Sequence, residues 1–148
     1  TWSVWINVTN FSAYYDIMNK GLTSAGNYYW YVDITTGKTV FQYASAGGVQ
    51  TIGNSALAVH TAGVWEKWTI VVSGTSGYVY KNGVLLVTNA GLNTSPTTNT
   101  SILYLGQSGG NAEHFKGGLI LGELLPIAQT TPEITKSFNQ EKSLFGVL

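Results

Sequence analysis

The chain has 148 residues, of which 44% are hydrophobic, so it is long and apolar enough for one packed domain, and disorder is excluded. Only 9% of the residues are charged, and neutral Ser, Thr and Asn must therefore cover much of the surface. Seven lysines balance seven acidic residues, and arginine, the side chain best suited to phosphate and guanine, is absent, which argues against nucleic acid as a partner.

The first half of the chain is predicted to form short β-strands, because apolar and polar residues alternate between frequent turn signals. The expected strands cover residues 2–8, 14–19, 28–33, 38–43 and 50–52. Thr36-Gly37 is the predicted turn between the third and the fourth of these strands. Because a strand begins almost at residue 1, we expect the chain to be the C-terminal piece of a larger polypeptide.

The second half continues this pattern and contains the clearest hairpin. Residues 65–73 form the strongest predicted strand, with Trp68, Ile70 and Val72 on one face that is expected to be core. Asn82-Gly83 lies between β-rich runs at 78–81 and 84–87 and accepts the positive φ angles of a type I′ turn. Two more strands are expected, over residues 102–105 and 117–125.

One helix is predicted at the end of the chain, over residues 131–139. Thr131 is the expected cap, with Pro132 at the first helical position and Glu133 in the first turn. Ile134 and Phe138 form an i,i+4 apolar pair that can dock on a sheet. The predicted fold is therefore an all-β, antiparallel two-sheet sandwich with one short C-terminal helix, formed by residues 1–148 as a single domain.

The order of these segments resembles the laminin-G-like members of the concanavalin A-like lectin/glucanase superfamily. The Asn82-Gly83 hairpin is similar to the family motif LYVNGVLV, and residues 103–106 are similar to LYIG. The other similar segments are 2–7, 17–21, 65–71, 115–123 and 131–139. The resemblance implies a jelly roll of two antiparallel sheets, of the type found at the C-terminus of phage and bacterial surface proteins.

The sequence departs from the family pattern at two places. Glu66 and Lys67 replace a pair of histidines that usually follows the tryptophan, and Leu121 replaces an acidic residue of the closing strand. The resemblance therefore does not carry a metal or ligand site over to this chain.

Enzyme activity is not expected. Glycosidases on this fold place two carboxylates close together on one strand, and the acidic residues here are widely separated. Ser108 lies in a G-x-S-x-G match, but no helix is predicted after it, and cysteine nucleophiles are absent. No cofactor is expected, although a weak calcium site that uses Asp16 or Asp33 with backbone carbonyls stays open.

Aromatic residues carry the functional hypothesis, because sugar rings dock on aromatic side chains while neutral amides bind sugar hydroxyls. Three of the four residues Trp5, Trp30, Trp65 and Trp68 are expected in the core. Tyr29 and Tyr31 alternate with Trp30, so an inward Trp30 places both on the opposite face. The candidate glycan-binding residues are Tyr29, Tyr31, Tyr14, Tyr15, Asn111 and His114, against the alternative that an exposed tyrosine is usually only surface.

These observations predict a non-enzymatic carbohydrate-binding or adhesion module of an extracellular or virion-surface protein, such as a tail fibre, a capsid decoration or a bacterial surface protein. Its expected partners are a glycan or surface polysaccharide and other subunits of a larger assembly. The alternative is a purely structural or protein-binding module of a virion or filament, and the third reading is a glycoside hydrolase. Membrane insertion is not expected, because no segment approaches roughly 20 consecutive apolar residues.

Overall fold

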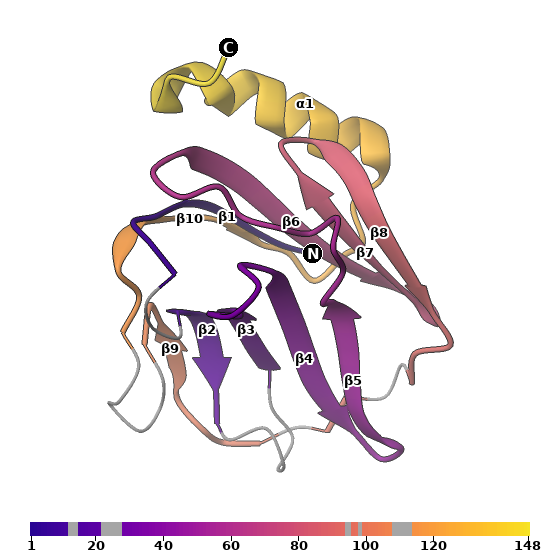
Figure 1. Ribbon diagram of the computed structural model, residues 1–148. Helices are drawn as coiled ribbons and strands as arrows, with labels where there is room; N and C mark the ends of the chain where they lie inside the picture. The colour runs from indigo at the N-terminus through magenta and orange to yellow at the C-terminus, as the bar shows by residue number, and fades with distance from the viewer. Residues whose placement is uncertain (12–14, 22–27, 94–95, 98, 108–113) are drawn as a thin grey trace.

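The protein folds as two antiparallel β-sheets stacked face to face, with one helix packed on the outside of one sheet (Figure 1). The structure, a computed structural model, describes residues 1–11, 15–21, 28–93, 96, 97, 99–107 and 114–148. The predicted all-β jelly-roll sandwich with a C-terminal helix is confirmed.

We call the two sheets A and B. Sheet A contains, in spatial order, β10 (Gly117–Leu124), β1 (Trp2–Val8), β6 (Trp65–Ser73), β7 (Ser76–Lys81) and β8 (Val84–Ala90). Sheet B contains, in spatial order, β5 (Gly48–Gly53), β4 (Thr39–Ser45), β3 (Tyr28–Val32), β2 (Tyr15–Lys20) and β9 (Leu103–Leu105). Every predicted strand is present, and the strand ends differ from the predicted ones by at most three residues.

The core lies between the sheets and is built from alternate residues of their strands. Trp30 of β3, Phe41 of β4 and Trp68 of β6 are almost completely buried there. Ile70 follows Trp68 on the same face of β6 and is also fully buried, so the predicted core face of this strand is confirmed. Inside the core the Trp30 indole nitrogen donates to Thr39 Oγ1 at 2.7 Å, which satisfies a buried polar group.

The turn between β7 and β8 has the predicted type I′ character. Asn82 and Gly83 have φ angles of 51° and 79°, both in the left-handed region. Gly83 is also needed for packing, because a Cβ atom there would lie 3.2 Å from Phe138 Cβ and from Thr135 Cα. Gly83 therefore has two roles: it accepts the positive φ angle of the hairpin turn, and its lack of a side chain leaves room for the helix.

The C-terminal helix begins as predicted but has a different cap. Helix α1 (Thr131–Glu141) is followed by the 3-10 helix η1 (Lys142–Phe145). The N-cap is Thr130 and not Thr131, because Thr130 keeps an extended backbone and donates to the Glu133 carboxylate through both its N–H and its hydroxyl, each at 2.7 Å. Neither helix, within the part of the chain that the structure describes, is long and apolar enough to cross a bilayer.

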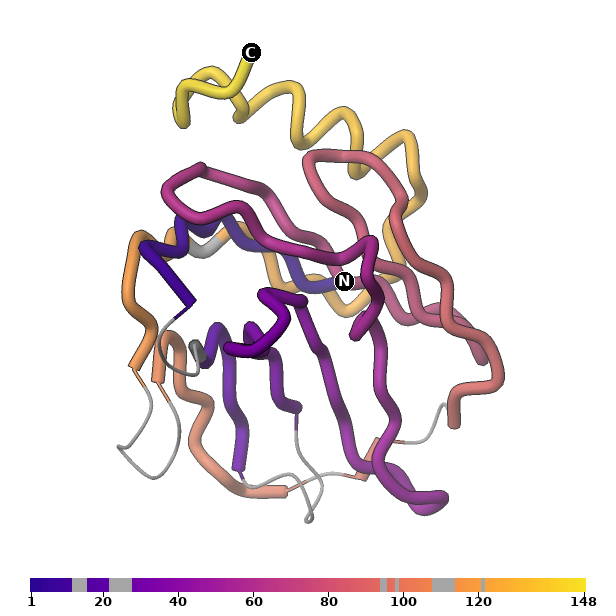
Figure 2. The backbone as a smooth tube through the Cα atoms, viewed as in Figure 1, coloured from indigo at the N-terminus to yellow at the C-terminus, as the bar shows by residue number. Residues whose placement is uncertain are grey.

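Helix α1 and η1 cover the outer face of sheet A (Figures 1 and 2). The Trp5 ring stacks on Phe145 with 4.0 Å between ring centroids, and Ile134 is buried among residues of β6 and β7. Lys67 of β6 is buried on the same face, and its ammonium group lies 2.7 Å from a Glu141 carboxylate oxygen. The helix lies on sheet A, and the outer face of sheet B is on the opposite side of the sandwich.

The sequence predicts that three of four tryptophans are core residues. Three of the four are buried, which confirms that prediction. Trp30 and Trp68 lie between the sheets, whereas Trp5 lies on the other face of β1 beneath the C-terminal helices. Trp65 is partly exposed and contacts Phe145, with 5.2 Å between ring centroids.

Candidate functional site

The outer face of sheet B carries a row of polar and aromatic side chains that crosses all five strands. Residues that are directly opposite one another in paired strands share a face of the sheet. Starting from the outward position of Tyr29, the row contains Tyr104, Asn19, Tyr29, Gln42 and Thr51, on β9, β2, β3, β4 and β5 respectively. The Gln42 amide nitrogen donates to the Thr51 hydroxyl at 3.3 Å, so neighbouring members of the row are joined.

Tyr29 and Tyr31 lie side by side on this face. Their ring centroids are 4.5 Å apart and the ring planes make an angle of 25°, which is a stacked pair. Trp30 between them points into the core with 2% of its surface exposed. The prediction that both tyrosines share the face opposite to Trp30 is confirmed, and both side chains are partly exposed.

A buried carboxylate holds the Tyr29 ring in place. The Tyr29 hydroxyl donates to Asp16 Oδ1 at 2.8 Å, and Asn19 Nδ2 lies 3.4 Å from the other oxygen of the same carboxylate. Asp16 has no exposed surface and Asn19 is 5% exposed. Because the tyrosine ring is fixed at its hydroxyl end and stacked on its neighbour, this aromatic surface is ordered before any ligand arrives, which lowers the entropic cost of binding.

Of the other predicted site residues, the structure describes the backbone of Tyr15 and the whole of His114. Tyr14 and Asn111 lie outside the described residues, as does Ser108 of the G-x-S-x-G match. Tyr15 is the first residue of β2 and pairs with Val32, but its side chain is outside the described part. His114 is exposed and forms an isolated bridge with Gln107, two residues after β9, so it lies at the β9 edge of sheet B.

Asp33, one of the two acidic residues considered for calcium, has a structural role. Its Oδ1 accepts hydrogen bonds from the Thr36 hydroxyl and from the N–H groups of Thr35 and Thr36, and these bonds hold the turn between β3 and β4. The hydrogen bond from the Thr36 hydroxyl is the main reason that the pKa of Asp33 is lowered. Among the described residues, no group of three or more metal-ligating side chains comes together.

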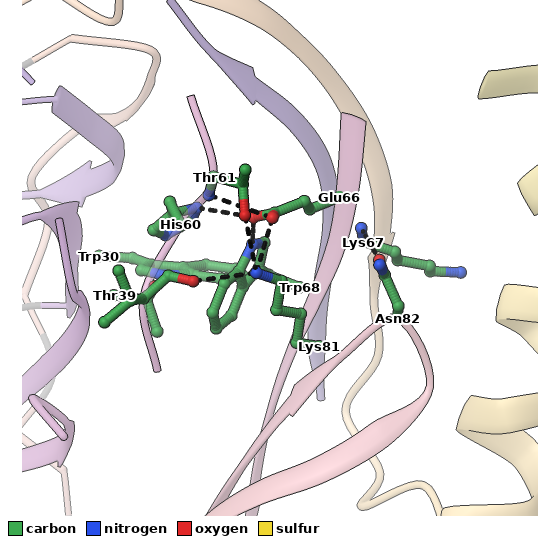
Figure 3. Close-up of polar contacts among 10 residues, drawn as sticks. Trp30, Thr39, His60, Thr61, Glu66, Lys67, Trp68, Lys81 and Asn82 are labelled. Atoms are coloured by element: carbon green, nitrogen blue, oxygen red, sulfur yellow. Dashed lines mark hydrogen bonds and ion pairs between the residues drawn. The ribbon is translucent and has the colours of Figure 1, made fainter. Parts of the chain in front are cut away.

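A buried polar cluster at the end of the core is the feature that sequence reasoning missed (Figure 3). The Glu66 carboxylate accepts from Lys81 Nζ at 2.6 Å, from the Trp68 indole nitrogen at 3.0 Å and from Thr61 N at 3.1 Å. His60 packs on the Trp68 ring with 4.2 Å between centroids, and its Nδ1 lies 3.6 Å from Glu66 Oε2. Burial, with a smaller contribution from the Lys81 charge, places the pKa of His60 well below its usual range.

This cluster is a structural element of the core. Glu66 is 2% and His60 is 4% exposed, so a substrate has little access to either group. The strand pattern contained a signal for it: Glu66 lies two residues before Trp68 and therefore on the core face of β6, where a carboxylate needs buried partners.

The sequence and the fold were also compared with known proteins. A family model described as the Concanavalin A-like lectin/glucanases superfamily matches residues 1–134. A comparison with curated proteins found no match.

Solved structures with similar folds include carbohydrate-binding and toxin domains. The binding domain of Paraclostridial Mosquitocidal Protein 1 is 17% identical, with a TM-score of 0.63, and the match covers 94% of this chain and 36% of that chain. The CBM40 domain of the Ruminococcus gnavus IT-sialidase, bound to alpha2,6 sialyllactose, is 15% identical, with a TM-score of 0.69 and coverages of 93% and 82%. Domain 4 of AbnA, a GH43 extracellular arabinanase from Geobacillus stearothermophilus, in complex with arabinotriose, is 16% identical, with a TM-score of 0.65 and coverages of 91% and 64%. At these identities the similarity is one of fold.

Proposed function

We propose that this chain, which belongs to the concanavalin A-like lectin/glucanase superfamily, is a non-enzymatic carbohydrate-binding module whose site is the outer face of sheet B. The observation that carries the proposal is the stacked pair of Tyr29 and Tyr31 within a row of amide and hydroxyl side chains. Aromatic rings offer an apolar surface to the C–H face of a sugar, and amides and hydroxyls bind its hydroxyl groups. Similar folds bound to sialyllactose and arabinotriose support this function.

The chemistry of this face favours a neutral glycan. The row across sheet B contains no lysine, and the chain contains no arginine, so no cation of the row can pair with a sugar carboxylate. The carboxylate beside the row, that of Asp16, is buried and accepts the Tyr29 hydroxyl. We therefore expect the module to prefer neutral sugars to sialylated ones.

The described carboxylates support a binding role over hydrolysis. Asp33 holds a turn, Glu66 lies in the buried cluster, Glu133 caps a helix and Glu141 pairs with Lys67. The other two described carboxylates, Asp16 and Glu123, accept from the Tyr29 hydroxyl and from the Gln129 amide. A glycosidase needs two carboxyl groups that flank one glycosidic bond, and these six carboxylates each have separate partners.

The expected setting is an extracellular or virion-surface protein, where several copies of the module can lie on one surface.

The expected affinity of one module is low. A surface formed by two tyrosines and a few polar groups buries little ligand area, so a single module should bind with a Kd from about 0.1 mM to a few mM. Several copies on one surface would raise the overall avidity.

The test is calorimetry of sugar binding with two matched variants, guided by an array of neutral and sialylated glycans. Tyr31→Ala removes half of the stacked pair and is expected to weaken binding about tenfold. Tyr78→Ala is the control, because Tyr78 is also partly exposed but belongs to β7 of sheet A. Thermal melts of both variants establish that they are folded.

Each outcome decides between the readings. Binding that Tyr31→Ala removes and Tyr78→Ala keeps supports the site. Equal binding by wild type and Tyr31→Ala would place the glycan elsewhere. If the wild type binds no glycan, the alternative of a structural or protein-binding module is favoured. The observation that supports this alternative is a set of exposed leucines at another edge of the sandwich.

A further inference from the structure

Strands β9 and β10 form the edges of the two sheets on the same side of the sandwich (Figure 1). An apolar cavity of about 230 Å³ lies there, and an adjoining hollow of about 400 Å³ shares four of its lining residues. The shared residues are Trp2, Met18, Leu103 and Leu124. The two hollows thus form one groove between the sheets, which we call the edge groove.

The edge groove exposes side chains that point toward the inside of the sandwich. Leu103 and Leu105 of β9 pair with Lys20 and Met18 of β2, and Met18 in turn pairs with the inward Trp30, so both leucines are on the inner face of sheet B. They are nevertheless 41% and 45% exposed. Leu124 of β10, opposite Trp2, is 54% exposed. Inward leucines are normally buried, so the described residues leave the apolar space between the sheets incompletely filled at this edge.

The backbone of β9 has unused hydrogen-bonding groups along the same groove. Gly106 N donates to Ile17 O of β2, and successive residues of a strand direct their N–H and C=O groups to opposite sides. The main-chain groups of Tyr104 therefore point to β2, and those of Leu103 and Leu105 point away from it. Among the described residues, no backbone group of these two leucines has a partner on that side. Unpaired groups of this kind template the addition of another strand.

We propose that the edge groove binds an extended peptide segment of a separate partner protein, which adds to β9 as a sixth, antiparallel strand of sheet B. An apolar ligand without a backbone, such as an acyl chain, would fill the hollow but would cover the N–H and C=O groups of Leu103 and Leu105 without pairing them. An extended peptide satisfies both requirements, because its backbone pairs with β9 and its alternate side chains enter the groove. Every strand pair in sheet B is antiparallel, so the added strand is expected to be antiparallel as well.

The charges at the groove define the partner segment further. Two charged side chains line the groove. Glu123 lines the inner cavity, and its carboxylate accepts from Gln129 Nε2 at 3.3 Å. Lys20 lines the outer hollow next to Leu103, and no described group pairs with its ammonium. A strand antiparallel to β9 brings its C-terminal end to this place. The preferred segment therefore has apolar residues at two alternate positions, opposite Leu105 and Leu103, and an acidic residue at the next inward position.

The proposal concerns a second surface, separate from the proposed glycan site. The partner strand lies beyond β9 and its inward side chains enter the space between the sheets, whereas the tyrosine pair lies on β3 on the outer face. Failure of glycan binding would therefore leave this proposal untouched.

The experiment uses the peptide Thr-Val-Thr-Val-Thr-Glu and the folded chain. Binding is followed by calorimetry up to 5 mM peptide, and amide hydrogen exchange is measured residue by residue. A Kd of about 0.1 to 1 mM is expected for so short a strand. At saturation, exchange at the amides of Leu103 and Leu105 should slow at least about tenfold, and exchange at the Tyr104 amide, which points to β2, should change less than about twofold.

Two controls isolate the backbone and the groove. The same peptide with N-methylated valines keeps every side chain but loses the N–H groups that face β9, so its binding should be lost. Leu105→Glu should weaken the unmodified peptide at least about tenfold. Leu85→Glu should leave it within about twofold, because Leu85 has a similar exposure, 42%, but lies on β8 at the other side of the sandwich.

Several results would overturn the proposal. They are an absence of binding at 5 mM peptide, equal binding of the N-methylated peptide, and equal effects of the two leucine variants. A dimer that forms with rising protein concentration and is abolished by Leu105→Glu would show that a second copy of the chain occupies this edge instead. If Leu105→Glu fails to fold, the N-methylated peptide and the exchange pattern still decide the question with the wild-type protein.

Discussion

Acidification is expected to destabilise this protein through one buried side chain, His60. Its ring lies against Trp68, is 4% exposed, and both of its nitrogens lack a hydrogen-bond partner among the described residues. Burial and the nearby Lys81 charge depress the pKa of His60 well below its usual value of 6.5. The folded protein therefore holds a neutral histidine at a pH where the unfolded chain holds a charged one.

The sign and the size of the effect follow from proton linkage. Below pH 6.5 the unfolded state binds one more proton than the folded state, so the free energy of unfolding falls as the pH falls. The contribution of His60 is thus fully present above pH 6.5 and is lost progressively toward its lower folded-state pKa. Each pH unit between the unfolded-state and folded-state pKa values costs up to about 1.4 kcal/mol, so proton linkage limits the loss from His60 between pH 7.5 and pH 5.0 to about 2 kcal/mol.

Urea unfolding at pH 7.5, 6.5, 5.5 and 5.0 measures this slope, and His60→Phe should remove it. Phenylalanine keeps a ring against Trp68, and no hydrogen bond is lost, because the contact of His60 Nδ1 with Glu66 is 3.6 Å long. His114→Gln, a change of the exposed second histidine, should keep the wild-type slope. If the free energy of unfolding of His60→Phe falls as much between pH 7.5 and pH 5.0 as that of the wild type, the assignment of the pH dependence to His60 is wrong.

Two further predictions test the hairpin and the base of the tyrosine pair. Gly83→Val should cost about 1–3 kcal/mol or more in urea unfolding, because the position has a φ of 79° and its Cβ would press on Phe138 at 3.2 Å; an unchanged midpoint would refute this. Tyr29→Phe should cost about 1–3 kcal/mol, because it removes the hydrogen bond to the buried Asp16 carboxylate; a stability within 0.3 kcal/mol of wild type would show that the bond contributes little.

Local patterns were sufficient to predict the strands and the turns. Alternation alone placed β1 and β6 at their observed ends, because the side chains of a strand alternate between its two faces. Asn82-Gly83 specified its turn because few other residue pairs accept two positive φ angles. The helix was predicted, but its cap was assigned one residue late, since both Thr130 and Thr131 are good capping residues and Glu133 reaches back to Thr130.

The candidate site was predictable in part. Alternation around Trp30 was enough to put Tyr29 and Tyr31 on one face, and the structure adds that their rings stack. The row from Tyr104 to Thr51 could not be read from the sequence, because it depends on the spatial order of five strands that are far apart in the chain. Strand register is a long-range property and leaves no local pattern.

Tertiary packing alone decided which surfaces are closed and which are open. Trp5 and Lys67 point away from the space between the sheets and would be exposed on an isolated sandwich, yet both are buried because Phe138, Glu141 and neighbouring residues of the C-terminal helices pack on them. Leu103 and Leu105 have the inward positions of core residues, yet they are exposed because the sheet ends at β9. Hydrophobicity and period determine which face of an element seeks burial, whereas burial itself depends on which other segments reach that face.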